Sequence, residues 1–256
     1  MPASTYKSSS DKSLFPETTT NSSSPETPVA PAALRNVDLH GPSGRLEALL
    51  NEGHPDAPFV TLLCHPHPLG GGTMHNKVVY HAAKVFSGLG LPVLRFNFRG
   101  TGLSEGVHDG HAEVEDVRSG LDWLKQRYDK PIIAAGFSFG AAMGLKACST
   151  YPDIQGFAAL GLPTHAEGRD YTYPYLHNCT FSKLFLSGDR DRYAPPDQLH
   201  TLVASAPDPK QLSLIPDADH FFAGQLPAMQ AALGQWLRNT FLTVEKPGTN
   251  PARQIL

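Results

Sequence analysis

The stretch PIIAAGFSFGAAMGLKAC (131–148) decides how this chain folds. Its first six residues are an apolar run that ends at Gly136, which is typical of a buried β-strand, and the residues after Gly140 favour a helix. Between them, GFSFG (136–140) fits the pattern G-x-S-x-G, in which a strained turn lifts a serine hydroxyl clear of the strand. Both glycines are expected because neighbouring backbone passes close to such a turn. The stretch therefore predicts a strand, a sharp turn that presents Ser138, and a helix.

Strand-like and helix-like segments alternate along most of the chain. Two short alternating runs, at 35–40 and 44–52, predict an antiparallel pair. Apolar runs bounded by Gly or Pro predict buried parallel strands at 59–64, 91–98, 131–136, 156–162, 183–188 and 211–216. Helical patterns lie at 76–89, 112–128, 139–150, 196–206 and 222–240. This alternation predicts an α/β fold, with a mostly parallel sheet of about eight strands, helices on both faces, and chemistry at the carboxyl ends of the strands.

The two ends of the chain differ in composition from the middle. Residues 1–34 are rich in Ser, Thr, Pro and Glu and poor in large apolar residues, so we expect a disordered tail. Residues 245–256 have a similar composition, and we expect a second disordered tail there. One folded domain over 35–244 remains.

The bulk composition argues against several kinds of partner. The net charge of −3 gives no reason to expect nucleic acid, and no apolar run reaches the roughly 18 residues that a membrane span needs. The three cysteines, Cys64, Cys148 and Cys179, are an odd number without a C-x-x-C motif. They favour free thiols in a reducing, cytoplasmic setting. The sequence carries no signal for an oligomeric state.

A serine hydroxyl becomes a good nucleophile only when a base takes its proton. His220, in IPDADHFF after the last predicted strand, lies in the loop where that base is expected. The acid that orients the base is expected beyond the preceding strand, where KLFLSGDRDRYAPP offers Asp191, which we favour, and Asp189. Asp217 and Asp219 are too near His220 in sequence to reach its far nitrogen, and we expect them to cap the final helix. The order serine, acid, histidine is more specific than any one member.

Five motifs together resemble a compact group of bacterial α/β-superfamily hydrolases: CHPHPLGGGTMHNKVV, LRFNFRGTGLSEG, GFSFG, SGDRDRYAPP and DADHFF. This group carries an HPHP loop after an early strand and is related to serine-aminopeptidase-like and dienelactone-hydrolase-like proteins. The resemblance covers residues 36–240 and implies an α/β-hydrolase fold with Ser138, His220 and Asp191 as a catalytic triad. It implies a hydrolase, but no named reaction. Where a bulky residue is expected within L-x-G-G, this chain has Gly70.

The loop CHPHPLGGGTMHN (64–76) admits three interpretations. As a metal site, His65 and His67 would need a third ligand, and as a phosphate-binding loop the segment lacks Gly-Lys-Ser/Thr. We favour the third, an oxyanion hole made by the backbone N–H of Phe139 and an N–H of this loop. Proline has no N–H, so His67 supplies the first donor after the strand. We expect His65 to be a buried structural histidine bonded to a neighbouring loop, and we expect no metal and no cofactor.

The glycines that follow in this loop leave room for an acyl group. Segment 161–181 is the only room for a cap, and it is short, so we expect a minimal cap and an open site. The residues expected at the substrate pocket are Leu69, Gly70, Tyr171 and Tyr173. Arg99 is expected in a tight turn near the pocket floor, and Ser104 in a structural role.

These expectations combine into one functional hypothesis. A small acyl substrate, an ester or a thioester, is attacked by Ser138, with His220 as the base and Asp191 as its orienting acid. A peptidase or amidase that uses the same three residues is an alternative, since the chemistries share a triad. A non-catalytic relative that binds a small ligand is another, but such a relative is expected to lack a triad member, and none is missing here.

Overall fold

The computed structural model describes residues 33–166 and 171–242, together with Met1. The predicted disordered tails, 1–34 and 245–256, therefore lie outside the described residues except at their inner edge. There, Leu34 is already the first residue of strand β1 (Leu34–Gly41), because it pairs with Asn51 of the next strand.

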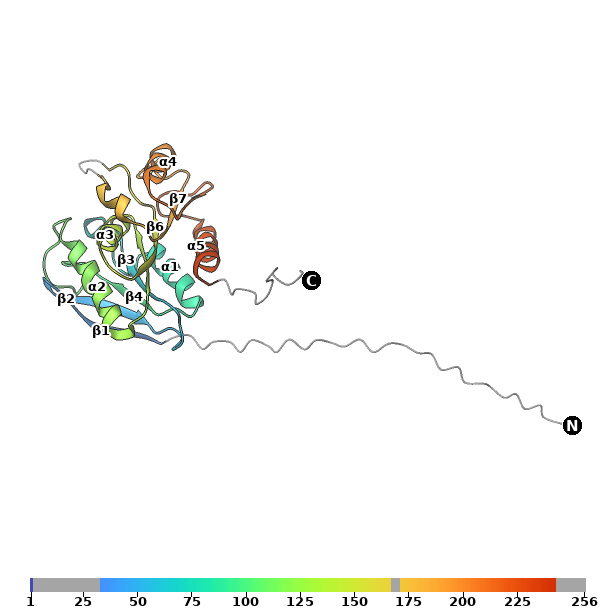
Figure 1. Ribbon diagram of the computed structural model, residues 1–256, viewed down its shortest axis with the longest axis horizontal. Helices are drawn as coiled ribbons and strands as arrows, with labels where there is room; N and C mark the ends of the chain where they lie inside the picture. Colours follow the sequence, from blue (N-terminus) through green and yellow to red (C-terminus); the bar gives the residue numbers. More distant parts are fainter. Residues whose placement is uncertain (2–32, 167–170, 243–256) are drawn as a thin grey trace, which may run out of the picture. The chain divides into compact units, whose positions relative to one another are not determined.

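An eight-stranded sheet forms the centre of the described residues (Figure 1). Its strands are β1, β2 (Gly44–Asn51), β3 (Val60–Cys64), β4 (Val93–Phe96), β5 (Ile132–Phe137), β6 (Ile154–Leu160), β7 (Ser182–Gly188) and β8 (Lys210–Ile215). The α-helices are α1 (Lys77–Gly88), α2 (Glu113–Tyr128), α3 (Phe139–Cys148), α4 (Pro196–Ser205) and α5 (Leu226–Phe241), and the short 3-10 helices are η1 (Pro68–Gly70) and η2 (Pro174–Asn178). Every predicted strand and helix is present, which confirms the α/β class.

The chain reverses its direction of travel across the sheet. The strand order is β1-β2-β4-β3-β5-β6-β7-β8, with β3 to β8 parallel and β2 antiparallel to both β1 and β4. The predicted antiparallel pair is thus confirmed. From β3 the chain moves to β4 on one side, then returns past β3 to β5 on the other. Because parallel crossovers are right-handed, this reversal places α1 and α2 on opposite faces.

The reversal also determines where the loops gather. In open parallel sheets, ligands bind beyond the carboxyl ends of the strands at such a switch point, because neighbouring loops there diverge toward opposite faces. Here the switch lies between β3 and β5. The loop after β3 carries His65 and His67, and the turn after β5 carries Ser138.

Two separate apolar cores cover the two faces of the sheet. Helices α1 and α5 cover one face, and α2, α3 and α4 cover the other (Figure 1). Successive strand residues serve different cores: Leu62 packs beneath α2 and α3, whereas Leu63 packs beneath α1 and α5. Burial on both faces explains why the strands form continuous apolar runs in the sequence. None of the described helices is both long and apolar enough to cross a membrane.

The last helix begins later than the sequence pattern predicts. The periodicity favours a helix from residue 222, but α5 starts at Leu226. Phe222 has φ +53°, which is the left-handed region and ends any helix, and its side chain is fully buried against the α1 and α5 core. Burying this ring outweighs the cost of the unusual backbone. β4 is likewise shorter than the predicted strand at 91–98.

Candidate active site

Ser138 occupies a strained turn between β5 and α3. Its φ of +55° and ψ of −119° are unusual for a residue with a Cβ, and its N–H donates to the carbonyl of Leu160 at 2.9 Å. The flanking glycines leave no room for a side chain. A Cβ on Gly136 would lie 2.3 Å from the carbonyl oxygen of Gly140, and a Cβ on Gly140 would lie 2.4 Å from that of His65. The predicted close backbone approach is therefore confirmed at both positions.

Three side chains from three loops meet beyond the sheet. His220, after β8, places Nε2 3.0 Å from Oγ of Ser138, and its Nδ1 lies 2.8 Å from Oδ2 of Asp191, which follows β7. The imidazole is held between aromatic rings, with the centroid of Tyr193 at 4.6 Å and that of Phe137 at 5.0 Å. The structure thus brings together the three residues that the sequence order singled out.

Asp191 is buried and accepts several hydrogen bonds. Oδ2 accepts from the hydroxyl of Ser187 at 2.9 Å, and Oδ1 accepts from the N–H groups of Tyr193 and Ala194 at 2.8 and 3.2 Å. Burial by itself would raise the pKa of Asp191, but the contact with His220 and these donors outweigh it, and the pKa is lowered. Asp191 is therefore a carboxylate that can stabilise a positive charge on His220.

The alternative acid, Asp189, does not reach His220. Its side chain is exposed, and its backbone N–H donates to the carbonyl of Ile215 at 3.1 Å. Close contact between the two loops explains why Asp191 faces inward: a Cβ on Gly188 would lie 2.0 Å from the carbonyl oxygen of Ala218. The acid is thus Asp191 by position.

Asp217 and Asp219 do not cap the final helix, so that prediction is wrong. Asp219 accepts the N–H groups of Phe221 and Ala223 at 3.0 and 2.9 Å, and so stabilises the turn that carries His220. Asp217 forms an ion pair with Arg190.

His65 is a structural residue, as predicted. The ring is fully buried; Nε2 accepts the N–H of Phe98 at 2.9 Å, and Nδ1 lies 2.6 Å from the carbonyl oxygen of Pro66. Burial lowers the pKa of His65 to about 4, so the ring is neutral at pH 7. Both ring nitrogens are engaged, which leaves none for a metal. Among the described residues, no group of three or more His, Cys, Asp or Glu side chains is placed to hold a metal ion.

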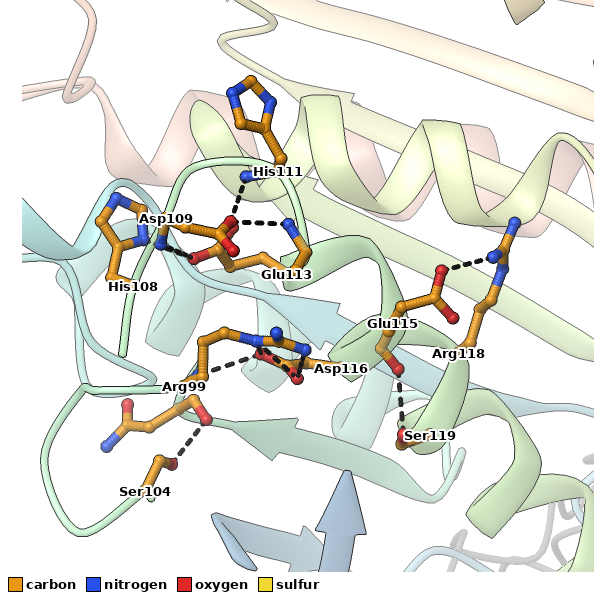
Figure 2. Close-up of polar contacts among 12 residues, drawn as sticks. Arg99, Ser104, His108, Asp109, His111, Glu113, Glu115, Asp116, Arg118 and Ser119 are labelled. Carbon is orange, nitrogen blue, oxygen red and sulfur yellow. Dashed lines mark hydrogen bonds and ion pairs between the residues drawn. The ribbon is translucent and has the colours of Figure 1, made fainter. Parts of the chain in front are cut away.

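The turn after β4 is also structural. Arg99 forms a buried ion pair with Asp116, with Nη2 2.6 Å from Oδ1 (Figure 2). The hydroxyl of Ser104 donates to the carbonyl of Asn97 at 2.7 Å and accepts the N–H of Glu47 at 2.9 Å. The predicted structural role of Ser104 is confirmed. Arg99 lies in the predicted turn, but it borders neither of the two cavities described below.

Two adjoining cavities flank the serine. One, of about 300 Å³, contains Ser138 and His220 and is bordered by Gly70, Tyr193 and Phe221. The second, of about 670 Å³, extends over the start of α3. The residues that border both are His67, Leu69 and Tyr171. All four predicted pocket residues border a cavity: Leu69 and Tyr171 both, Gly70 the smaller, and Tyr173 the larger.

The loop at Gly70 and the short cap leave space around the site. A Cβ on Gly70 would meet nothing within 4 Å, so the backbone does not require glycine there. The segment between β6 and β7 contributes only η2 as regular structure among its described residues. Leu69 is 80% exposed and Phe221 is 53% exposed at the mouth of the smaller cavity.

Sequence reasoning missed one group in the larger cavity. His108 borders it, and its Nδ1 lies 2.6 Å from Oε1 of Glu113, whose side chain is fully buried at the start of α2 (Figure 2). The segment that carries both residues reads as an ordinary polar loop and helix start, so no sequence signal marks the pair.

Comparison with known proteins agrees with this fold. Residues 60–232 match the family model described as an alpha/beta hydrolase domain. This match covers more than half of the chain, and the chain therefore belongs to the α/β hydrolase family.

One individual protein sequence and two solved structures are also similar to this chain over most of its length. The chain is 35% identical over 210 residues to an uncharacterized protein of Rickettsia prowazekii, a match that covers 78% of this chain and 87% of that one. A structure of an alpha-beta serine hydrolase homologue from Coxiella burnetii has a TM-score of 0.71 and 33% identity, and the match covers 79% of this chain and 97% of that one. A serine hydrolase without a lid from Xanthomonas campestris has a TM-score of 0.72 and 31% identity, with 83% and 97% covered.

Proposed function

We propose that this protein is a serine hydrolase that cleaves a carboxylic ester or thioester through an acyl-enzyme intermediate. The observation that carries the proposal is the unbroken chain of contacts from Oγ of Ser138 through the ring of His220 to the buried carboxylate of Asp191. With Nδ1–H donating to Asp191, the Nε2 lone pair of His220 faces the serine hydroxyl. That is the tautomer a general base requires.

The proposed reaction proceeds in two halves. Ser138 attacks the carbonyl carbon while its proton passes to Nε2 of His220, and the imidazolium then gives this proton to the departing alcohol or thiol. Water repeats the sequence on the acyl-enzyme: His220 takes a proton from water, hydroxide equivalent adds to the carbonyl, and the proton returns to Ser138 as the acid leaves. The lowered pKa of Asp191 supports this cycle because the carboxylate balances the transient charge on His220.

The oxyanion of each tetrahedral intermediate is assigned to the backbone N–H groups of Phe139 and His67. Phe139 is the first residue of α3, so its N–H lies outside the helix's own hydrogen-bond ladder, at the positive end of the helix dipole. The carbonyl of His67 accepts the N–H groups of Gly70 and Gly72, both at 3.0 Å, which fixes the peptide that directly follows the one carrying the donor N–H. Each such donor contributes roughly 3 to 4 kcal/mol in the transition state.

A fluorophosphonate probe tests the proposal. We expect wild-type protein to be labelled and the Ser138→Ala variant not, with circular dichroism showing that both are folded. Equal labelling of the two, or no labelling of folded wild type, contradicts the proposal. A panel of acyl esters, thioesters and amides with one common acyl group then separates esterase from amidase activity. Three unpaired cysteines fit a reducing compartment, and we include a cytoplasmic location in this proposal.

A further inference from the structure

The larger cavity lies on the acyl side of the nucleophile. In the proposed reaction His220 hands its proton to the leaving group, so the leaving group must lie beside His220. The smaller cavity contains His220, Tyr193 and Phe221, whereas none of these borders the larger one. The larger cavity instead begins at His67 and Phe139, the residues assigned to the oxyanion. An acyl group bonded to Ser138 therefore extends into the larger cavity.

The walls of this cavity are mainly aromatic and apolar. Phe139, Met143 and the segment that includes Tyr173 and Tyr175 border it. The hydroxyls of these two tyrosines are already used, since Tyr173 donates to Pro163 at 2.5 Å and Tyr175 donates to Ala142 at 3.1 Å. What they add to the cavity is ring surface, which favours a planar, ring-bearing acyl group.

One polar group of the cavity is held in place by a buried carboxylate. Glu113 is fully buried, and its Oε1 accepts the N–H of Asp109 at 3.1 Å and contacts Nδ1 of His108 at 2.6 Å (Figure 2). The side chain of His108 is only 9% exposed. Within residues 33–166 and 171–242, Nδ1 meets Glu113 as an ion-pair contact without hydrogen-bond geometry, and Nε2, the other ring nitrogen, makes no hydrogen bond. A nearly buried imidazole thus keeps one nitrogen unused in a cavity that it borders.

His108 also lies beside the rings of the two residues assigned to the oxyanion. The centroid of its ring is 4.6 Å from that of His67 and 5.6 Å from that of Phe139. An acyl group that enters this cavity past His67 and Phe139 therefore has His108 within the wall of its pocket. Lys146 and Asp109 carry opposite charges around the same cavity, so no net charge selects a charged acyl group.

We propose that the larger cavity is an acyl subsite for a ring-bearing acyl group with an uncharged hydroxyl, which donates a hydrogen bond to Nε2 of His108. This inference rests on the proposed function. Glu113 is a positioning residue: its carboxylate lies 2.6 Å from Nδ1, so in the proposed complex Nδ1 carries the proton of the ring and Nε2 accepts the hydrogen bond from the acyl group. No bond is made or broken at His108.

Matched esters test the subsite. The substrates are para-nitrophenyl esters of phenylpropanoate and of para-hydroxyphenylpropanoate, which share one leaving group and differ by one hydroxyl. We expect wild type to prefer the hydroxylated ester by about tenfold in kcat/KM, the effect of one good hydrogen bond. His108→Phe should reduce that ratio to about one, because the ring remains and the acceptor is lost. His108→Asn, which restores an acceptor, should recover part of the preference, and His75→Phe, an exposed histidine bordering neither cavity, should leave it unchanged.

The outcomes separate this inference from the proposed function. If wild type hydrolyses both esters equally, and loses both activities in Ser138→Ala, the hydrolase proposal stands and the subsite is wrong. Preference for a para-carboxyphenylpropanoate ester over the hydroxylated one also overturns it. If no ester is turned over, calorimetry on Ser138→Ala decides: para-hydroxyphenylpropanoate should bind about fivefold more tightly than phenylpropanoate, and adding His108→Phe should remove the difference. Equal binding of the two acids rejects the subsite.

Discussion

Two aspartates only two positions apart have opposite surroundings. Asp191 is buried among hydrogen-bond donors, whereas Asp189 points to solvent. Both follow the same strand and both match the acid position in sequence. The difference arises because Gly188 brings β7 against the loop of His220, which folds the next residues inward around Asp191.

Paired substitutions at these aspartates test the assignment. Asp191→Asn should lower kcat by about 10⁴-fold, because the amide holds His220 in the wrong tautomer while keeping its shape. The exposed Asp189→Asn should stay within about threefold of wild type. Steady-state kinetics on one ester, with melting temperatures as a check on folding, gives both numbers. Comparable losses in the two variants would contradict the assignment of Asp191.

The residues of the site differ in how well sequence could identify them. Ser138 and His220 follow from motif and position, because the strained turn and the last loop have strict chain-order requirements. The choice of Asp191 over Asp189 required knowing which way each side chain points. That direction reverses between these two positions of the loop. His108 and Glu113 had no signal at all, because their contact depends on how the start of α2 packs beside the loop after β3.

At the scale of elements, close packing of α3 against β3 positions Ser138. Gly140 lies where a Cβ would meet carbonyl oxygens of Cys64 and His65 at 2.5 and 2.4 Å. The N-terminus of α3 therefore touches the backbone that leads into the His67 loop, and the two proposed oxyanion donors are set relative to each other by this contact.

Gly140→Ala should disturb this contact. We expect a loss of about 1 to 3 kcal/mol in the free energy of unfolding, because the methyl group forces backbone apart, and a fall in activity larger than the stability loss explains. Gly88→Ala, at the exposed end of α1 where a Cβ meets nothing within 4 Å, should be neutral or stabilise by up to about 1 kcal/mol. Urea denaturation measures both. If Gly140→Ala leaves the free energy of unfolding unchanged, the backbone accommodates the added methyl group without an energetic cost.

Element boundaries show where sequence patterns are insufficient. Strand and helix positions follow from apolar periodicity, which is strong in buried segments. The start of α5 did not follow from this periodicity. Phe222 and its neighbours have helical spacing, but Phe222 turns into the core with a left-handed backbone. A tertiary contact overrode the local pattern.

At the scale of the molecule, one buried histidine makes the stability of the fold depend on pH. His65 joins the loop after β3 to the end of β4 through the N–H of Phe98, and it stays neutral because burial lowers its pKa to about 4. In the unfolded chain a histidine has a pKa of about 6.5. Below that value the unfolded state binds a proton that the folded state does not bind. The free energy of unfolding therefore falls as pH decreases from about 6.5 toward 4.

The size of this effect can be measured by difference. Between pH 7 and pH 4.5, His65 alone should cost the wild type about 2 kcal/mol of unfolding free energy. A His65→Asn variant is less stable at pH 7 but lacks this proton uptake, so its deficit should shrink by about that amount at pH 4.5. Urea titrations at both pH values provide the comparison. A constant deficit would mean that His65 has an ordinary pKa in the folded state.

The sequence patterns did not predict the order of the strands in the sheet. Alternation predicts a parallel sheet but not that β4 and β5 lie on opposite sides of β3, since crossovers of similar length can step either way. That reversal brings the loops of Ser138 and His67 together, and it is the reason a site exists at this edge.

The two cavities share only His67, Leu69 and Tyr171 among their described lining residues, and this separation has a practical consequence. With the proposed assignment of the larger cavity to the acid and the smaller cavity to the alcohol, we expect that the two preferences can be redesigned independently. A library at Met143 and Tyr175 should yield enzymes that accept new acids with the same alcohol preference, and a library at Phe221 and Tyr193 should do the converse. Variants from the two libraries should then combine additively, because none of the four library positions borders both cavities.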